Sequence, residues 1–482
     1  MWKLLIFIFI THLGYSQVEV GSLIEEMPND SILPLTLNNH TGIRPFNRVN
    51  NNFQHKFSLK SVKNSSKIAI TPIVDLGLQI DNATSYKTGL GATITGIFKN
   101  KLYYKFSAIQ GVGEASEKLF QPKSYVFNQK TGKSFTYTDI RGRLSYTANK
   151  FFNFQAGLDH NFIGEGNRSL LLSDYGKPYP FAKIRANFWR FDYTALYQFY
   201  REQAPNEQWK SKYSAAHLLS FNATKGINFS FFESVVFSPK DTNLNRGFDA
   251  EYLNPIIFYR PQEYALGSSD NTFMGFQFSA KYKKHTFYGQ GMFDDFLLAE
   301  MRARSRYWSN KYAGQIGIKG RFNSNNKKFF YRVEANFARP YTYSHKNSSQ
   351  NYGNQGYALA HPYGASFYEI LGELKWQKSN WIFKIFCNYY LRGIDKNDGI
   401  SYGGNIYQSY DSHPYEYQNK IGQGVKLNGV HGVFTTAYLL DKASNLQLFL
   451  ENHFQGNTLI SNHVYYLVLG LRSNLWNDYR NY

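Results

Sequence analysis

The sequence of 482 residues contains a single cysteine, Cys387. One thiol excludes an internal disulfide. The sequence also lacks a long hydrophobic run, because no stretch approaches the roughly 20 consecutive apolar residues that a membrane-spanning helix needs. Acidic residues are scarce, with 34 Asp and Glu against 54 Lys and Arg, which gives a formal net charge of +20. These features exclude a disulfide-stapled fold and a helical membrane anchor, and the positive charge favours anionic partners.

Motifs for catalysis and cofactor binding are missing as well. There is no phosphate-binding G-x-x-x-x-G-K-[ST] loop and no Cys-x-x-Cys pair for zinc. The residues that could act in a hydrolase or bind calcium are isolated: His361 near Ser366, His413 near Ser412, Asp294–Asp295, Asp270–Asn271 and Asp395–Asp398. None of them has a recognisable catalytic context or a sufficient set of calcium ligands. The sequence therefore predicts a protein that is not an enzyme and has no metal or other cofactor.

The first residues have the pattern of an export signal. Lys3 precedes an apolar run at residues 4–10, and Gly14 and Ser16 supply small residues just before Gln17. A charged start, a short apolar segment and a small-residue cleavage site are typical of a secretory signal peptide. We therefore expect residues 1–16 to be a signal peptide.

After this segment, apolar and polar residues alternate one by one in many short stretches. In residues 68–81 the apolar side chains share one face and the polar ones the other, a period of two that indicates a strand. The residues expected to face lipid in such strands include Ile70, Leu76, Ile94, Phe154 and Ile184. Basic residues such as Lys183 then lie on the opposite face, with Asn187. Export together with this alternation predicts a transmembrane β-barrel with a polar lumen.

Composition agrees with this class. Aromatic residues make up 18% of the chain although its mean hydropathy is −0.47, and membrane barrels place aromatics in girdles at both interfaces. We predict an all-β fold, a transmembrane antiparallel up-and-down outer-membrane β-barrel of about 16 to 18 strands. Residues 17–66 are expected to form an N-terminal periplasmic or lumen-occupying plug segment, and residues 67–482 the barrel. The expected location is the outer membrane of a Gram-negative bacterium.

Longer polar stretches between strands are predicted to be surface loops, because extracellular loops of such barrels are long and periplasmic turns short. The clearest are residues 201–212, 239–254, 344–364 and 392–424. The last two are rich in Tyr, Asn, Gln, Gly and His. Tyrosine faces stack on sugar rings and amides bond hydroxyl groups, so this composition suits carbohydrate binding. It equally suits any exposed loop that must be soluble with little charge.

Several segments resemble known families. The stretch G-E-G-N-R-S-L-L-L-S-D at residues 164–174, followed by Tyr179-Pro180, resembles Wzi-type capsule-assembly proteins. The segments at residues 41–46, 252–260 and 361–365, with Glu369 after the last, resemble gliding-motility RemB proteins. These resemblances imply an outer-membrane barrel without enzymatic activity that takes part in motility or in handling surface polysaccharide.

The candidate ligand-binding residues come from the Gly-flanked turn, the polar face of two hairpins and the resembling segments: Glu165, Asn167, Arg168, Asp174, Arg141, Arg143, Arg185, Glu233, Tyr252, Asn254, His361 and Tyr363. The turn cluster could hold a ligand, or it could only order a loop. Glu233 interrupts the alternation of its strand, which predicts a β-bulge and a lumen arginine as its partner.

The expected partners are outer-membrane lipid and lipopolysaccharide, acidic surface polysaccharide, and motility or capsule machinery, but not nucleic acid. An alternative function remains open at this point. A barrel with a basic lumen could be a porin-like channel or transporter that favours anions.

Overall fold

The computed structural model describes most of the chain after residue 58. The described residues are 40–45, 59–63, 66–114, 126–254 and 270–473, apart from gaps at 82–83, 100, 204–208, 240–246, 397, 443 and 460–462, with the short strands β1 (Glu19–Val20) and β3 (Asn47–Arg48). The signal peptide predicted for residues 1–16 lies outside them. Among the described residues, no helix has the length and apolar character needed to cross a membrane.

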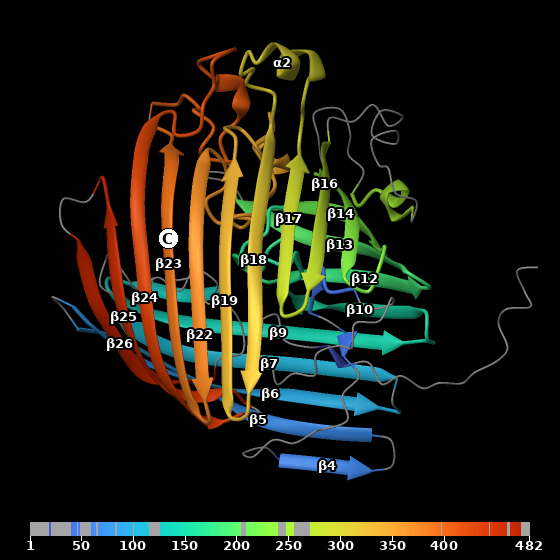
Figure 1. Cartoon of the computed structure of the whole chain (residues 1–482), viewed down its shortest axis with the longest axis vertical. Coiled ribbons are helices and arrows are strands. Elements are labelled where there is room, and N and C mark those ends of the chain that lie inside the picture. The colour runs from blue at the N-terminus through green and yellow to red at the C-terminus, as the bar shows by residue number, and fades with distance from the viewer. Residues whose placement is uncertain are drawn as a thin grey trace, which may run out of the picture.

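Eighteen antiparallel strands close into a barrel in the described part of the chain. They are β5 (Ser66–Ile80), β6 (Thr84–Phe98), β7 (Leu102–Glu114), β9 (Ser134–Thr147), β10 (Phe152–Asp159), β12 (Tyr179–Phe188), β13 (Phe191–Gln203), β14 (Trp209–Asn222), β15 (Ile227–Phe237), β16 (Asn271–Tyr282), β17 (His285–Phe293), β18 (Tyr312–Ser324), β19 (Lys327–Ala338), β22 (Phe367–Lys378), β23 (Trp381–Ile394), β24 (Val425–Asp441), β25 (Leu446–Asn457) and β26 (Val464–Ser473). Each pairs with the next, and β26 closes the barrel on β5. In Figure 1, β17 to β25 run upright while β5, β6, β7 and β9 cross behind them. The predicted fold class and strand number are confirmed.

Two further strands extend the wall locally. β4 (Leu59–Lys63) pairs with the first residues of β5, and β8 (Val126–Thr131) pairs with the first residues of β9. Strand pairing therefore begins before Lys67, where the sequence pattern placed the start of the barrel. The C-terminal residues 474–482 lie outside the described residues.

The connections are short at one end of the barrel and long at the other. The short ones include two-residue turns whose first residue has a positive φ, such as Trp189 at 52°, Lys283 at 53° and Asn325 at 40°, as hairpin turns that match strand twist require. Short turns mark the periplasmic end and long loops the extracellular end. One predicted loop is much shorter than expected: Arg201 and Lys212 both lie within paired strands.

The outer face of the wall is apolar, as the alternation predicts. The five residues expected to face lipid have exposed fractions of 36 to 42%, which confirms their register. Cys387 also lies on this exposed outer face, in β23. Exposed aromatics stand beside the periplasmic turns, among them Trp189, Tyr282 and Trp381. This placement is the aromatic girdle of a membrane barrel.

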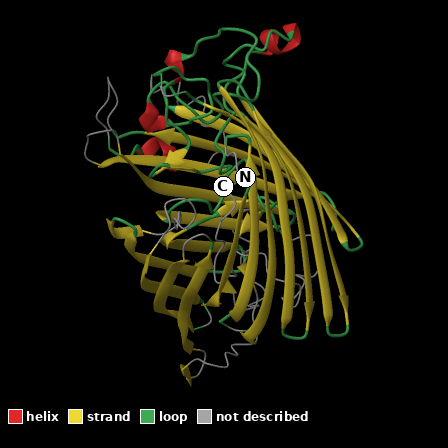
Figure 2. Cartoon of the chain, turned by 90° about the vertical axis from the view of Figure 1, so that its left-hand side faces the viewer, coloured by secondary structure: helices red, strands yellow, loops and turns green. Residues whose placement is uncertain are grey.

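The lumen holds chain segments that enter from the extracellular end (Figure 2). We call residues 160–178 and 339–366 the lumenal loops. Leu170, Leu171, Tyr343, Tyr352 and Leu359 of these loops are buried against inward side chains of the wall in the largest apolar cluster. Short strand pairs support the loops: β2 (Ile43–Arg44) with β11 (Phe162–Ile163), and β20 (Gly353–Asn354) with β21 (Tyr357–Ala358).

The position of the second lumenal loop corrects a prediction. Residues 344–364 were expected to form a surface loop, but Gln350, Asn351, Asn354, His361 and Tyr363 are each at most 2% exposed. The same tyrosines and amides that suit a sugar also suit a barrel interior, where hydrogen bonds to the wall satisfy them. This loop therefore cannot present its aromatic faces to a polymer outside the cell.

The helical elements are few and short. η1 (Ala250–Leu253), η2 (Ser348–Gln350) and η3 (Tyr410–Ser412) are single 3-10 turns, and α2 (Leu298–Ala303) is a short α-helix. In Figure 1, α2 lies at the top of the molecule, above β17 and β18. The described helices therefore belong to loops and not to the wall.

Candidate functional site

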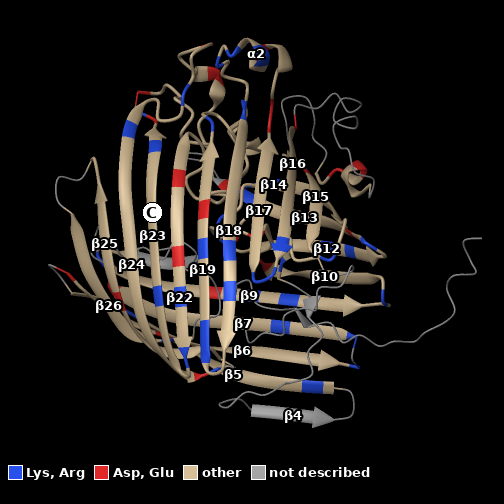
Figure 3. Cartoon of the chain, viewed as in Figure 1, with Lys and Arg blue, Asp and Glu red and all other residues tan. Residues whose placement is uncertain are grey.

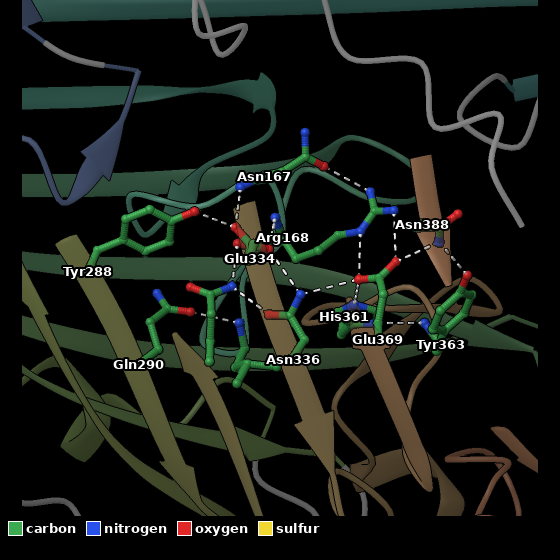
Figure 4. A network of polar contacts seen from close by, with 12 residues as sticks. Asn167, Arg168, Tyr288, Gln290, Glu334, Asn336, His361, Tyr363, Glu369 and Asn388 are labelled. Carbon is green, nitrogen blue, oxygen red and sulfur yellow. Dashed lines mark hydrogen bonds and ion pairs between the residues drawn. The ribbon is translucent and has the colours of Figure 1, made fainter. Parts of the chain in front are cut away.

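The Gly-flanked turn of the first lumenal loop is held by one carboxylate of the wall. Glu334 of β19 accepts hydrogen bonds from the backbone N–H groups of Asn167 and Arg168, at 2.8 and 3.1 Å. The hydroxyl of Tyr288 and the amide of Asn336 donate to the same carboxylate, at 2.8 and 3.0 Å (Figure 4). A Cβ at Gly166 would lie 2.5 Å from Glu334 Oε2, so a larger residue would push the turn off the carboxylate.

A second carboxylate, Glu369 of β22, binds the side chain of the same turn. Arg168 Nε and Nη2 donate to its two oxygens at 3.3 and 3.1 Å. Asn336 and Asn388 add amide donors at 3.2 and 2.8 Å. Arg168 and Glu369 are each 1% exposed. A buried ion pair persists only when further hydrogen bonds satisfy both partners, and the bonds to Glu369 are of that kind.

His361 joins the second lumenal loop to this ion pair. Its Nε2 lies 2.8 Å from Glu369 Oε2, and its Nδ1 accepts from the backbone N–H of Tyr363 at 3.1 Å. This geometry fits a ring that carries its proton on Nε2. The ring also stacks on Phe367, with centroids 4.1 Å apart. Burial lowers the pKa of His361 to about 4, although Glu369 acts to raise it. The ring is therefore neutral at pH 7.

Glu165 ties the same turn to β18 and to the N-terminal segment. Lys319 Nζ lies 2.8 Å from Glu165 Oε2, and Thr41 donates to the other oxygen. Burial alone would raise the pKa of Glu165, but Lys319, Lys281 and these hydrogen bonds outweigh it and lower the pKa to about 2. Arg44 donates to Gly166 O at 2.8 Å. The described part of the N-terminal segment thus contacts the lumenal loop.

We call Glu165, Arg168, Glu334, His361 and Glu369 the latch. Its members come from both lumenal loops and from two wall strands, and Figure 3 shows acidic residues in the middle of β19 and β22. The carboxylates are bonded within the protein by two to five donors each, so little of their capacity is left for a ligand. The latch therefore orders the loops in the lumen, which is the structural alternative considered for the turn cluster.

The predicted basic residues of the lumen wall are also paired. Arg141 makes two bonds to Asp139, at 2.9 and 2.8 Å. Arg143 contacts Asp159 at 3.2 Å and Gln155 at 2.8 Å. Arg185 forms an ion pair with Asp192, in which Nε lies 2.6 Å from Oδ2. The sequence correctly placed these arginines inward, but their charge is balanced locally.

Three predicted site residues lie away from the latch. Glu233 lies on the outward side of β15, like Phe231, and its cross-strand neighbours are His217 and Met274. Pairing is regular on both sides of Glu233, so the predicted bulge is wrong, and the lumen arginines point to the opposite face. Polar residues are tolerated there because the outer face nearby is covered by residues 247–254.

The other two residues belong to this outer cover. Tyr252 packs on Phe237, with ring centroids 4.7 Å apart, and its hydroxyl donates to Asp270 at 2.7 Å. Asn254 ends the turn η1. Asp174, by contrast, is buried inside the barrel with the latch loop. The structure therefore brings together Glu165, Asn167, Arg168, His361 and Tyr363 and separates them from Glu233, Tyr252 and Asn254.

Sequence reasoning missed the wall partners of the latch: Glu334, Asn336, Lys319, Asn388 and, as a site residue, Glu369. Alternation could have placed each of them on the lumenal face, as for Arg141 and Arg143. It could not have paired them with the turn, because Arg168 and Glu369 are 201 positions apart. Among the described residues, no group of three or more His, Cys, Asp or Glu side chains is placed to hold a metal ion.

The latch is expected to weaken in acid. The fold lowers the pKa of Glu165 from its ordinary value of 4.5 to about 2. The ionised carboxylate therefore stabilises the fold above pH 4.5, and this stabilisation is lost as the pH falls toward 2. The lowered pKa of His361 destabilises the fold as the pH falls from 6.5 toward 4, because the unfolded chain binds the proton first. Ion current through single barrels in planar bilayers should therefore appear or rise between pH 7 and pH 4. An identical current at both pH values would contradict this.

The fold and the latch together define a closed outer-membrane β-barrel with ordered loops in its lumen. No family model matches the chain, and no curated protein matches its sequence. Among solved structures it is similar to Wzi, an outer membrane protein involved in group 1 capsule assembly in Escherichia coli and a carbohydrate-binding β-barrel. The TM-score is 0.53 at 13% identity, over 84% of this chain and 83% of that one.

Two further solved structures are similar at lower scores. OprD from Pseudomonas aeruginosa has a TM-score of 0.44 at 9% identity, over 89% of this chain and 97% of that one. OccAB4 from Acinetobacter baumannii has a TM-score of 0.44 at 8% identity, over 85% and 98%. The likeness to Wzi shows a shared barrel fold. A closed barrel of 18 strands with an apolar outer face and aromatic girdles is the architecture of a protein of the Gram-negative outer membrane.

Proposed function

We propose that this chain is a non-enzymatic surface barrel that binds acidic surface polysaccharide, as part of capsule or exopolysaccharide assembly or of gliding motility. The observation that carries the proposal is the latched lumen. Two loops fill the interior around a buried apolar cluster and are bonded to the wall through Glu334 and Glu369. Loops that are bonded to the wall inside the lumen suit a scaffold that presents a binding surface at its extracellular end. They suit a pore that passes solutes less well.

Two further observations support a polysaccharide ligand. The chain carries a formal net charge of +20, which attracts an anionic polymer over a long range. The Wzi barrel, whose fold this chain shares, is described as carbohydrate-binding. The proposed partners are therefore acidic surface polysaccharide and the capsule or motility machinery that handles it, together with the lipid and lipopolysaccharide around the barrel.

One observation favours a channel instead. On the inner face of β24, the buried His431 has no hydrogen-bond partner on either ring nitrogen among the described residues, and Asn388 Oδ1 has none either. Buried polar groups of this kind are ordinarily satisfied by ordered water. A water-filled passage between the lumenal loops and the strands β23 to β25 would satisfy them and would make the barrel a porin-like channel.

The test measures binding and conductance on the same preparation. Purified barrel should retain alginate, an acidic polysaccharide, at low salt, and should lose much of it as the Debye length falls to about 8 Å near physiological salt. Neutral dextran of similar size serves as the control and should not be retained. Single barrels in planar bilayers should be electrically quiet at pH 7. A large anion-selective conductance without alginate retention would establish the channel and overturn the proposal.

A further inference from the structure

Arg141, Arg143, Arg168 and Arg185 are each paired with a carboxylate inside the barrel. We infer that acidic polysaccharide binds instead at the extracellular tip, on a surface formed by two loops that meet above the barrel. We call this surface the apical patch and define it by Arg302, Arg304, Arg306, Tyr415 and Tyr417. The inference deepens the proposed function and rests on it, because it names the surface that contacts the polymer.

The two loops of the apical patch are joined through their backbones. Trp308 N–H donates to Glu416 O at 3.0 Å, Gln418 N–H to Ser305 O at 3.1 Å, and Asn419 N–H to Arg306 O at 3.1 Å. In Figure 1, α2 and the loop between β23 and β24 lie together at the top of the molecule. Residues more than 100 positions apart thus form one surface.

The arginines of the patch point away from the protein. All three are exposed, and Arg304 and Arg306 have positive φ angles of 52° and 57°. Such left-handed backbone is uncommon for a residue with a side chain and persists only where the surroundings hold it. Their guanidinium groups make no hydrogen bond or ion pair with any residue that the structure describes. Their charge therefore remains available to a ligand.

Two acidic residues of the same loops, Glu300 and Glu416, are already engaged. Glu300 accepts a hydrogen bond from Ser305 at 2.7 Å. Glu416 Oε2 lies 3.2 Å from His413 Nε2. These contacts hold the two carboxylates within their own loops. The patch therefore presents cations outward and keeps its own anions occupied.

Aromatic side chains stand beside the arginines. Tyr415 is 53% exposed and Tyr417 is 48% exposed. Tyr417 packs on Tyr307 with centroids 5.7 Å apart, and Trp308 stacks on His413 at 4.3 Å. The contact with Tyr307 restricts the position of Tyr417, so less entropy is lost when a sugar packs on that ring. Planar guanidinium groups bind carboxylates through two parallel hydrogen bonds, and aromatic faces pack on sugar rings. A uronic-acid polymer offers both a carboxylate and a sugar ring.

The decisive variant replaces the three arginines together: Arg302→Gln, Arg304→Gln and Arg306→Gln. We expect alginate retention at low salt to fall by about tenfold, because three exposed ion pairs together reach that order. Tyr415→Ala with Tyr417→Ala should remove most of the retention that survives at physiological salt. The heat-modifiable migration of the folded barrel checks that each variant is assembled.

The matched control removes three charges at the other end of the barrel: Lys99→Gln, Lys283→Gln and Lys284→Gln. These lysines are exposed on short turns, and two of them share the positive φ of the patch arginines. The control should retain alginate within about twofold of the unaltered barrel, since only its net charge changes. Equal losses in both triple variants, or no loss in the arginine variant, would overturn the apical patch while leaving the proposed function intact. Failure of the unaltered barrel to retain alginate would overturn the proposed function, and the inference with it.

Discussion

Replacing Glu369 by glutamine is expected to destabilise the barrel by about 3–5 kcal/mol, because it leaves the Arg168 guanidinium buried without its counter-ion. The change also weakens the bond to His361, so both lumenal loops lose their common anchor on β22. Urea titration followed by heat-modifiable migration measures the stability. The same preparation should show ion current in planar bilayers at pH 7, where the unaltered barrel is expected to be quiet.

A double variant separates the ion pair from the rest of the latch. Arg168→Met combined with Glu369→Leu removes both charges while keeping side chains of similar size. Replacing a buried ion pair by apolar groups is often close to neutral, so the double variant should recover most of the stability lost in Glu369→Gln. If Glu369→Gln alone were as stable as the unaltered barrel, the latch would not be what holds the loops in place.

Arginine in place of Ile184 is expected to cost about 2–4 kcal/mol, because it places a charge on the lipid-facing side of β12. Ile184 is 39% exposed on the outer face. Asn187 lies three positions after Ile184, faces the lumen and donates a hydrogen bond to Asp192 at 2.9 Å. Asn187→Arg places the new charge beside that carboxylate and should be far milder. Refolding yield into lipid vesicles measures both, and equal damage at the two positions would refute the register of β12.

The latch changes the interpretation of the Gly-flanked turn at residues 164–174. Its turn looks like a binding cluster in sequence, yet its donors and acceptors are consumed in holding residues 160–178 against Glu334 and Glu369. In our proposal, the groups that contact a polymer lie in the apical patch. A barrel organised in this way can display a binding surface outside the cell while its wall and interior stay rigid.

The sequence by itself determined the class of fold and the facing of its strands. Every second residue must be apolar where a strand meets lipid, so alternation alone places Ile140 and Leu144 on the outer face and Arg141 and Arg143 on the lumenal face. The exposed fractions of Ile140 and Leu144, 55% and 42%, agree with this assignment. The same alternation places Glu233 outward with Phe231, and the prediction of a bulge there failed because it gave the charge more weight than the period. Only a loop that covers the outer face makes that position tolerable.

Tertiary structure alone decided which loops enter the lumen and which remain outside. Residues 344–364 and 392–424 are both rich in Tyr, Asn, Gln, Gly and His, but Tyr352 and Tyr363 of the first are buried while the second exposes Tyr415 and Tyr417. Composition cannot distinguish them, because tyrosine and amide side chains are satisfied equally by water, by a sugar or by a polar wall. The pairing of Arg168 with Glu369 likewise depends on barrel closure, which brings residues 201 positions apart into contact. Local periodicity determines the wall, whereas the contents of the lumen follow from contacts that exist only after the barrel has closed.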